Sequence, residues 1–286
     1  MFTRMPSALL AQAVCAGALA TVVAGATPAS AQTTVPCSAT ALSAAITAAN
    51  VSGGTLVLSP GCTYALTTPL PAITNTVTIN ARHSTITRTS AAGFSILTVA
   101  FGGNLSLLDA TITNGDAPDF GGGIANHGAL TVTGSAIVGN HGNFSGGIGG
   151  GTGSVTHVVK SSVMDNTANN NGGGLANDGQ MTIEDSRIID NTAVNGVGGA
   201  VANDGILVVS SSNLNENSAH RGGGVANVGG GLTTLNSSNV NNNTADVQPG
   251  GILNTGGTVT LNASRVKGND PTNCTGSPVA VPGCTN

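Results

Sequence analysis

The chain repeats itself every 25 or 26 residues, and this period limits its fold more than any other feature. Seven similar segments run from "ATITNG" to "SRVKGN", and each has one aliphatic residue at its centre. These aliphatic residues are Ile112, Ile137, Val163, Ile188, Leu214, Val240 and Val266. Their spacings are 25, 26, 25, 26, 26 and 26 residues. A fixed period of this length is typical of solenoids, in which each repeat stacks on the next.

Each period holds two further elements, and neither is long enough to be a helix. One alternates apolar and polar residues, as in "GALTVTGS" and "GQMTIEDS", with aliphatics such as Leu130 and Val132 two residues apart. This spacing is typical of one face of a strand. The other element is rich in glycine, as in "GGGIANHG" and "GGGLANDG". Three strands of about four to six residues and their corners fill the period, which predicts a parallel β-solenoid.

Asparagines form a second column with the same period. Its members are Asn140, Asn166, Asn191, Asn217, Asn243 and Asn269. An asparagine amide both donates and accepts hydrogen bonds, so stacked copies can bond to one another and to the corner backbone. We expect an asparagine ladder inside one corner of the solenoid.

The segment "STITRTSAAGFSILTVAFGGNLSLLDATITNG", followed by repeated "GGGxAN" and "SxI..N" motifs, resembles the secreted proteins of the pectin-lyase-like superfamily. The repeats are also similar to those of polymorphic outer membrane proteins. The resemblance covers roughly Cys37 to Asn269 and implies an all-β, right-handed parallel β-helix with three-stranded coils. It implies little about activity, because this fold carries lyases, hydrolases, adhesins and inert scaffolds.

Four segments are expected along the chain. Residues 1–31 are typical of a signal peptide, with Arg4, an apolar run and a small-residue cleavage site ending at Ala31, so we expect a secreted, extracellular protein. Residues 32–79 form an N-terminal cap and the first strands, including a short amphipathic helix over residues 38–50 with Leu42, Ile46 and Ala49 on its inner face. Residues 80–270 form the coils, and residues 271–286 form a C-terminal tail.

Four cysteines remain after the signal peptide, an even number that indicates disulfides in an exported chain. They are Cys37, Cys62, Cys274 and Cys284. Four cysteines allow three connectivities. One pair lies near each end of the sequence, which favours Cys37–Cys62 and Cys274–Cys284.

The composition excludes some functions and weakens others. Only 7% of the residues are charged and the net charge is −4, which gives no basic surface for nucleic acid. Tryptophan is absent, and the only tyrosine, Tyr64, lies in the predicted cap. Grooves that bind sugar chains usually present aromatic rings, so this count argues against such a groove.

Two columns of acidic residues are the candidate sites. Asp165, Asp190 and Glu216 precede the column asparagines, and Arg187 on the outer side of the same coil is the best candidate for a base. Asp178 and Asp204 follow the asparagine of the glycine-rich corner and are the candidate metal ligands, for calcium. Stacked carboxylates can also act as an acid and a nucleophile. The alternative is structural, because aspartate at a corner commonly makes local hydrogen bonds.

Two further groups of polar residues have weaker patterns. His127, His141 and His157 fall too irregularly for a metal site, and we expect each to be an isolated surface residue. A hydroxyl-rich strip on the outer face of the alternating strand is the second group, and a flat ladder of this kind can order water. Its predicted members are Ser106, Thr131, Thr133, Thr156, Thr182, Thr258 and Thr260.

The sequence therefore predicts a secreted or surface-associated, non-enzymatic β-helix protein for adhesion or glycan binding. Its expected partner is a polysaccharide or cell-surface glycan. We expect a monomer with no cofactor, with calcium as the alternative, and with no membrane span after signal cleavage. One alternative is a polysaccharide lyase or glycoside hydrolase that acts on an acidic polysaccharide, and another is an ice-binding β-solenoid.

Overall fold

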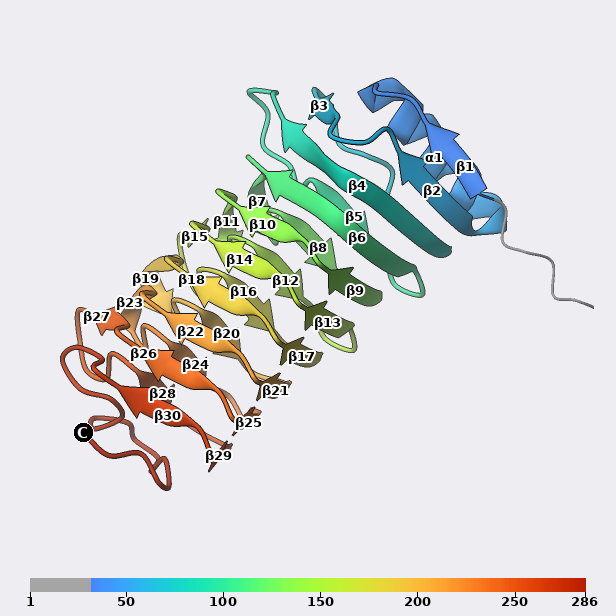
Figure 1. Ribbon diagram of the computed structural model, residues 1–286. Helices are drawn as coiled ribbons and strands as arrows, with labels where there is room; N and C mark the ends of the chain where they lie inside the picture. Colours follow the sequence, from blue (N-terminus) through green and yellow to red (C-terminus); the bar gives the residue numbers. More distant parts are fainter. Residues whose placement is uncertain (1–31) are drawn as a thin grey trace, which may run out of the picture.

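A computed structural model describes residues 32–286 as a right-handed parallel β-helix, in which successive coils stack along one axis. In Figure 1 the coils run from α1 (Ala39–Ser52), drawn in blue, to the C-terminal tail, drawn in red. The predicted fold class is thus confirmed. The predicted signal peptide, residues 1–31, lies outside the described residues.

Three parallel sheets, named A, B and C here, form the sides of the helix. Sheet A begins with β1 (Gln32–Val35), β2 (Gly54–Leu58), β3 (Thr63–Leu66), β4 (Thr76–Arg88) and β6 (Asn104–Thr113). It continues as one column of β9 (Ala129–Thr133), β13 (Val155–Val159), β17 (Gln180–Glu184), β21 (Ile206–Ser210), β25 (Leu232–Asn236) and β29 (Thr258–Asn262). A second column contains β10 (Ala136–Val138), β14 (Ser162–Met164), β18 (Arg187–Ile189), β22 (Asn213–Asn215), β26 (Asn239–Asn241) and β30 (Arg265–Lys267).

Sheet A therefore holds two short strands in most coils, and they correspond to the alternating element and to the segment with the central aliphatic residue that the sequence predicts. The two strands are separated at a residue with a left-handed backbone, such as Gly134 with φ 59°, Lys160 with φ 48° or Asp185 with φ 49°. This conformation bends the chain, so the coil has four short strands on three sides. The three elements that the sequence predicts in each period form the strands of sheets A and B, and the short strand of the third sheet is the addition.

Sheets B and C complete each coil. Sheet B contains β5 (Leu97–Val99), β8 (Ile124–Asn126), β12 (Ile148–Gly150), β16 (Leu175–Asn177), β20 (Val201–Asn203), β24 (Val225–Asn227) and β28 (Ile252–Asn254). Sheet C contains β7 (Asp116–Phe120), β11 (His141–Phe144), β15 (Thr167–Ala168), β19 (Thr192–Val197), β23 (Ser218–Arg221) and β27 (Thr244–Ala245).

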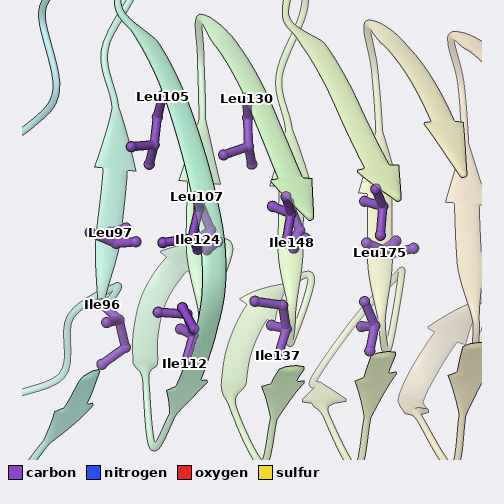
Figure 2. Close-up of a cluster of buried hydrophobic side chains, with 14 of the residues drawn as sticks. Ile96, Leu97, Leu105, Leu107, Ile112, Ile124, Leu130, Ile137, Ile148 and Leu175 are labelled. Carbon is purple, nitrogen blue, oxygen red and sulfur yellow. The ribbon is translucent and has the colours of Figure 1, made fainter. Parts of the chain in front are cut away.

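The core consists of aliphatic columns that run down the helix axis. Ile124, Ile148 and Leu175 are register partners on sheet B, and all three are fully buried. Figure 2 shows this row beside a second row that contains Ile112 and Ile137, with the side chains pointing into the interior. Each coil alone exposes its aliphatic residues, so burial depends on stacking.

The predicted asparagine ladder is present at the corner between sheets A and C. Nδ2 of Asn166 donates to Oδ1 of Asn191 at 2.9 Å, and Nδ2 of Asn191 donates to Oδ1 of Asn217 at 2.9 Å. Asn191 also donates to the carbonyl oxygen of Val163 at 3.0 Å. Because these amides are fully buried, their mutual hydrogen bonds satisfy groups that water cannot reach.

Each end of the helix has its own cover. Helix α1 buries Leu42, Ile46 and Ala49 as predicted, and the hydroxyl of Ser38 caps its first turn. The two disulfides pair Cys37 with Cys62 and Cys274 with Cys284, so the favoured connectivity is confirmed. No helix among residues 32–286 is long and apolar enough to cross a membrane.

Candidate functional site

The first acidic column lies at the corner that the asparagine ladder fills. Asp165, Asp190 and Glu216 have φ values of 56°, 56° and 60°, and all three are exposed. The left-handed region is costly for most residues and is tolerated best by Gly, Asn and Asp. The corner geometry therefore accounts for the aspartates of this column, while a catalytic role for it stays a prediction.

Arg187 lies on the outer side of sheet A, where it is exposed at the start of β18. Its register partners are Ser162 and Asn213. The ion pairs found within residues 32–286 do not include Arg187 or this acidic column. Arg187 thus begins β18 while Asp190 follows its end, and no ion pair within residues 32–286 joins them.

The second acidic column borders a groove on the outer face of sheet B. Asn177 and Asn203 are register partners on β16 and β20, so Asp178 and Asp204 follow each other in successive coils. Neighbouring strands lie about 4.8 Å apart. The groove has a volume of about 340 Å³, and Ala176 and Ala202 form part of its floor.

Two phenylalanine rings, which no repeated motif of the sequence marks, line the same groove. Phe120 and Phe144 are register partners at the ends of β7 and β11. The side chain of Phe144 is 41% exposed. The count of tryptophan and tyrosine that argued against an aromatic groove leaves out these two phenylalanine rings.

The ring of Phe120 lies over the outer face of sheet B. A Cβ atom built on Gly149 would approach Cε1 of Phe120 to 2.6 Å, so the ring covers a position that only glycine leaves open. His127 is also near this ring, with 5.7 Å between the two ring centroids. Packing against Gly149 and His127 thus holds Phe120 across the face of the sheet.

The charge of the groove is negative. Asp119, Asp178 and Asp204 line it, and no lysine or arginine does. Burial raises the pKa of the Asp178 carboxyl above its ordinary value, and the negative charge of Asp204 raises it further. Both causes act because the groove wall removes water and places two carboxylates in neighbouring coils.

Within residues 32–286 there is no cluster of three or more His, Cys, Asp or Glu side chains able to hold a metal ion. Asp178 and Asp204 alone would therefore supply the carboxylates for calcium, which usually takes six to eight oxygen ligands. Calcium binding at this pair stays a prediction.

A second polar cluster lies on sheet C, and no sequence motif indicates it. Nδ1 of His141 lies 2.8 Å from Oδ1 of Asp116, and Nη2 of Arg88 lies 3.4 Å from Oδ2 of the same carboxylate. Together they border an open hollow of about 630 Å³. His141 is thus not the isolated residue that was predicted, because β7 and β11 pair side by side. Nε of Arg88 also donates to the carbonyl oxygen of Asn114 at 2.9 Å. Arg88 therefore links the end of β4 to the corner that follows β6.

The predicted hydroxyl strip on sheet A needs one correction. Thr156 pairs with Leu130 and Met181, so it points inward and is fully buried, and its neighbour His157 takes the outer position. The buried hydroxyl is satisfied because Oγ1 accepts from Nδ2 of Asn126 at 2.9 Å. Along the outer row that contains Thr131 and Thr182, His157 and Val208 interrupt the hydroxyls.

No known family model matches the chain, and no curated protein matches it. Among solved structures, the chain is similar to one described as the crystal structure of pectate lyase Pel9A, with 14% sequence identity and a TM-score of 0.47. The alignment covers 82% of this chain and 76% of that chain.

Proposed function

We propose that this protein is a secreted, non-enzymatic β-helix protein that binds a neutral or amino-sugar glycan in the groove on sheet B. One observation carries the proposal: two phenylalanine rings and two adjacent carboxylates border a single groove. Aromatic rings offer flat apolar surfaces to the C–H faces of sugar rings, and carboxylates accept strong hydrogen bonds from hydroxyl and ammonium groups.

The charge of the groove favours one class of glycan over another. The lining has three carboxylates and no basic side chain, so an acidic polysaccharide would meet like charges. A neutral chain avoids this repulsion, and an amino sugar gains an opposite charge. The same lining lacks the arginine or lysine base that a polysaccharide lyase needs, which supports binding over lyase chemistry at this place.

The volume of the groove, about 340 Å³, is near the lower end of the range of about 300–1,000 Å³ for ligand sites. We therefore expect it to hold a short stretch of a longer chain. Secretion is supported by the two disulfides, which persist in oxidising compartments. The hydroxyl row supports no second function, because His157 and Val208 interrupt it.

Isothermal titration with chitosan hexamer, cellohexaose and polygalacturonate tests the proposal. We expect chitosan hexamer to bind most tightly, cellohexaose more weakly and polygalacturonate least. Phe144→Ala should weaken binding of the first two about tenfold, because it removes an exposed aromatic surface. Failure of both neutral and amino-sugar probes to bind would reject the proposal. Formation of unsaturated products from polygalacturonate would favour the lyase alternative instead.

A further inference from the structure

The C-terminal tail covers only two of the three sheets at the end of the helix. On sheet C, the N–H of Ala245 donates to the carbonyl oxygen of Asp270 at 2.9 Å. On sheet B, the N–H of Ile252 donates to Asn273 at 2.8 Å, and Asn254 accepts from Val279 at 3.0 Å. On sheet A, β29 pairs only with β25 and β30 only with β26 within the described residues. The outer edge of β29 and β30 is therefore open.

An open edge presents unpaired N–H and C=O groups, which make it a template for another strand. Beside this edge is a hollow of about 710 Å³, lined by residues 264–268 of the last coil and by residues 283–286 of the tail. The aliphatic column also becomes less covered here, because Val240 is fully buried while Val266 is only partly buried. The edge thus combines unpaired backbone N–H and C=O groups, a hollow, and the partly buried end of the aliphatic column at Val266.

The charge of this edge is opposite to that of the protein. The chain has a net charge of −4, yet β30 carries Arg265 and Lys267, both exposed, on either side of Val266. No acidic side chain lines the hollow. In an added strand, the residues opposite Arg265 and Lys267 would point outward, and the residue opposite Val266 would point to the core. Acidic residues at the two outer positions would form opposite-charge cross-strand pairs.

A second copy of this chain lacks that charge pattern at its own free edges. The first strand, β1, pairs only with β2 in the described residues, but residues 32–108 contain no Asp or Glu. Joining two C-terminal ends would place the two pairs of cations near each other. Neither arrangement supplies the carboxylates that Arg265 and Lys267 lack.

We infer that the free edge of β29 and β30 is a docking site for an extended acidic peptide segment with the pattern acidic–aliphatic–acidic. The segment adds to sheet A as one more strand, a known mode of peptide recognition. Main-chain hydrogen bonds supply its affinity, and the pattern opposite Arg265, Val266 and Lys267 supplies its specificity.

Fluorescence anisotropy tests this inference with a labelled peptide, Gly-Ser-Glu-Val-Glu-Val-Ser-Gly, and the full mature chain. We expect binding that weakens about tenfold with Lys267→Glu and more with Arg265→Glu. Lys160→Glu is the matched control, because it makes the same charge change at an exposed corner far from this edge. It should leave binding within about twofold of wild type. Circular dichroism melts of all three variants verify that they fold.

Two further peptides separate strand addition from attraction of charges alone. A peptide with lysine in place of glutamate should not bind. A peptide with proline in place of the valine between the glutamates should bind at least about tenfold more weakly, because proline cannot donate a ladder hydrogen bond. Equal binding of the proline peptide, no binding of the first peptide, or equal weakening by Lys160→Glu would overturn the inference. A wild-type dimer in sedimentation that Lys267→Glu dissociates would also overturn it, since a second copy would then occupy the edge.

Discussion

Two acidic columns look equivalent in the sequence, and the structure separates them. Asp165, Asp190 and Glu216 occupy a left-handed corner and are exposed beside the asparagine ladder. Asp178 and Asp204 instead follow the stacked asparagines Asn177 and Asn203, of which Asn177 donates from Nδ2 to Oδ1 of Asn203 at 2.7 Å. The side chains of both aspartates border a groove with two phenylalanine rings. Backbone conformation thus explains the aspartates at the first corner. The aspartates at the second corner border a groove large enough for a ligand. Four experiments test this division, beginning with the one of largest expected effect.

The ladders beside both columns should matter most for stability. Nδ2 of Asn191 donates to Val163 and to Asn217 within the core. Asn191→Ala leaves these buried groups without partners, and we expect the free energy of unfolding to fall by about 3–5 kcal/mol. Urea denaturation of wild type and Asn191→Ala measures this fall in the free energy of unfolding. A loss below about 1 kcal/mol would contradict a structural role for this corner.

A carboxylate change in each column should separate the columns by binding. Asp178→Asn removes a charge from the groove, and we expect chitosan hexamer to bind about tenfold more weakly, since hydrogen bonds to charged groups contribute about 1.5–3 kcal/mol. Asp190→Asn is the matched control and should leave binding unchanged. Titration calorimetry measures the affinity of both variants for chitosan hexamer. Equal losses would show that the division between the columns is mistaken.

The pH dependence of stability tests whether the groove raises the pKa of the Asp178 carboxyl. Because its pKa is raised in the folded state from the ordinary value of 3.8, the folded protein binds the proton more tightly than the unfolded chain does. The contribution of this group to stability is therefore complete below pH 3.8 and is lost as pH rises through the higher folded pKa. Compared with wild type, Asp178→Asn should be slightly more stable at neutral pH and no more stable below the ordinary value. Thermal melts across this pH range would show the opposite trend if the groove lowered the pKa instead.

The smallest effect is expected at the left-handed corner itself. Gly139 and Gly268 hold the equivalent slots in other coils, with φ values of 62° and 68°. Asp190→Gly should therefore change the free energy of unfolding by no more than about 1 kcal/mol, because glycine adopts this conformation without strain. Asp190→Val is the contrasting variant, since a β-branched residue fits a positive φ poorly. Similar denaturation curves for the two variants would argue against a corner set by backbone conformation.

Much of the fold was predictable because the repeat is visible in single residues. Ile137 and Val163 recur at a fixed spacing, and they are register partners in the structure. The asparagine ladder and the capping helix were predictable for similar reasons, since each depends on contacts one coil away or within one segment. The inward turn of Thr156 was not predictable. In "VTHVV" the aliphatic residues do not fix which alternate positions face the core, and a slip of one residue reverses every side chain.

The lining of the groove on sheet B could not be predicted from the repeat period. Asp178 and Asp204 were identified as a column, but Phe120 and Phe144 belong to corners of other coils and share no motif with them. Their rings border the same groove as the carboxylates because the corners between sheets C and B bring Phe120 over the outer face of sheet B. His141 and Asp116 meet for a comparable reason, through the pairing of β7 and β11.

The sequence by itself determined the stacking of this protein. A strict period places each residue beside its equivalent in the next coil, so the aliphatic columns, the ladders and the acidic columns follow from spacing alone. Only the tertiary structure decided which column borders a groove and which end of which sheet stays open. Those features depend on how corners and the tail fold across the coils, and lateral packing of this kind leaves no periodic signal in the sequence.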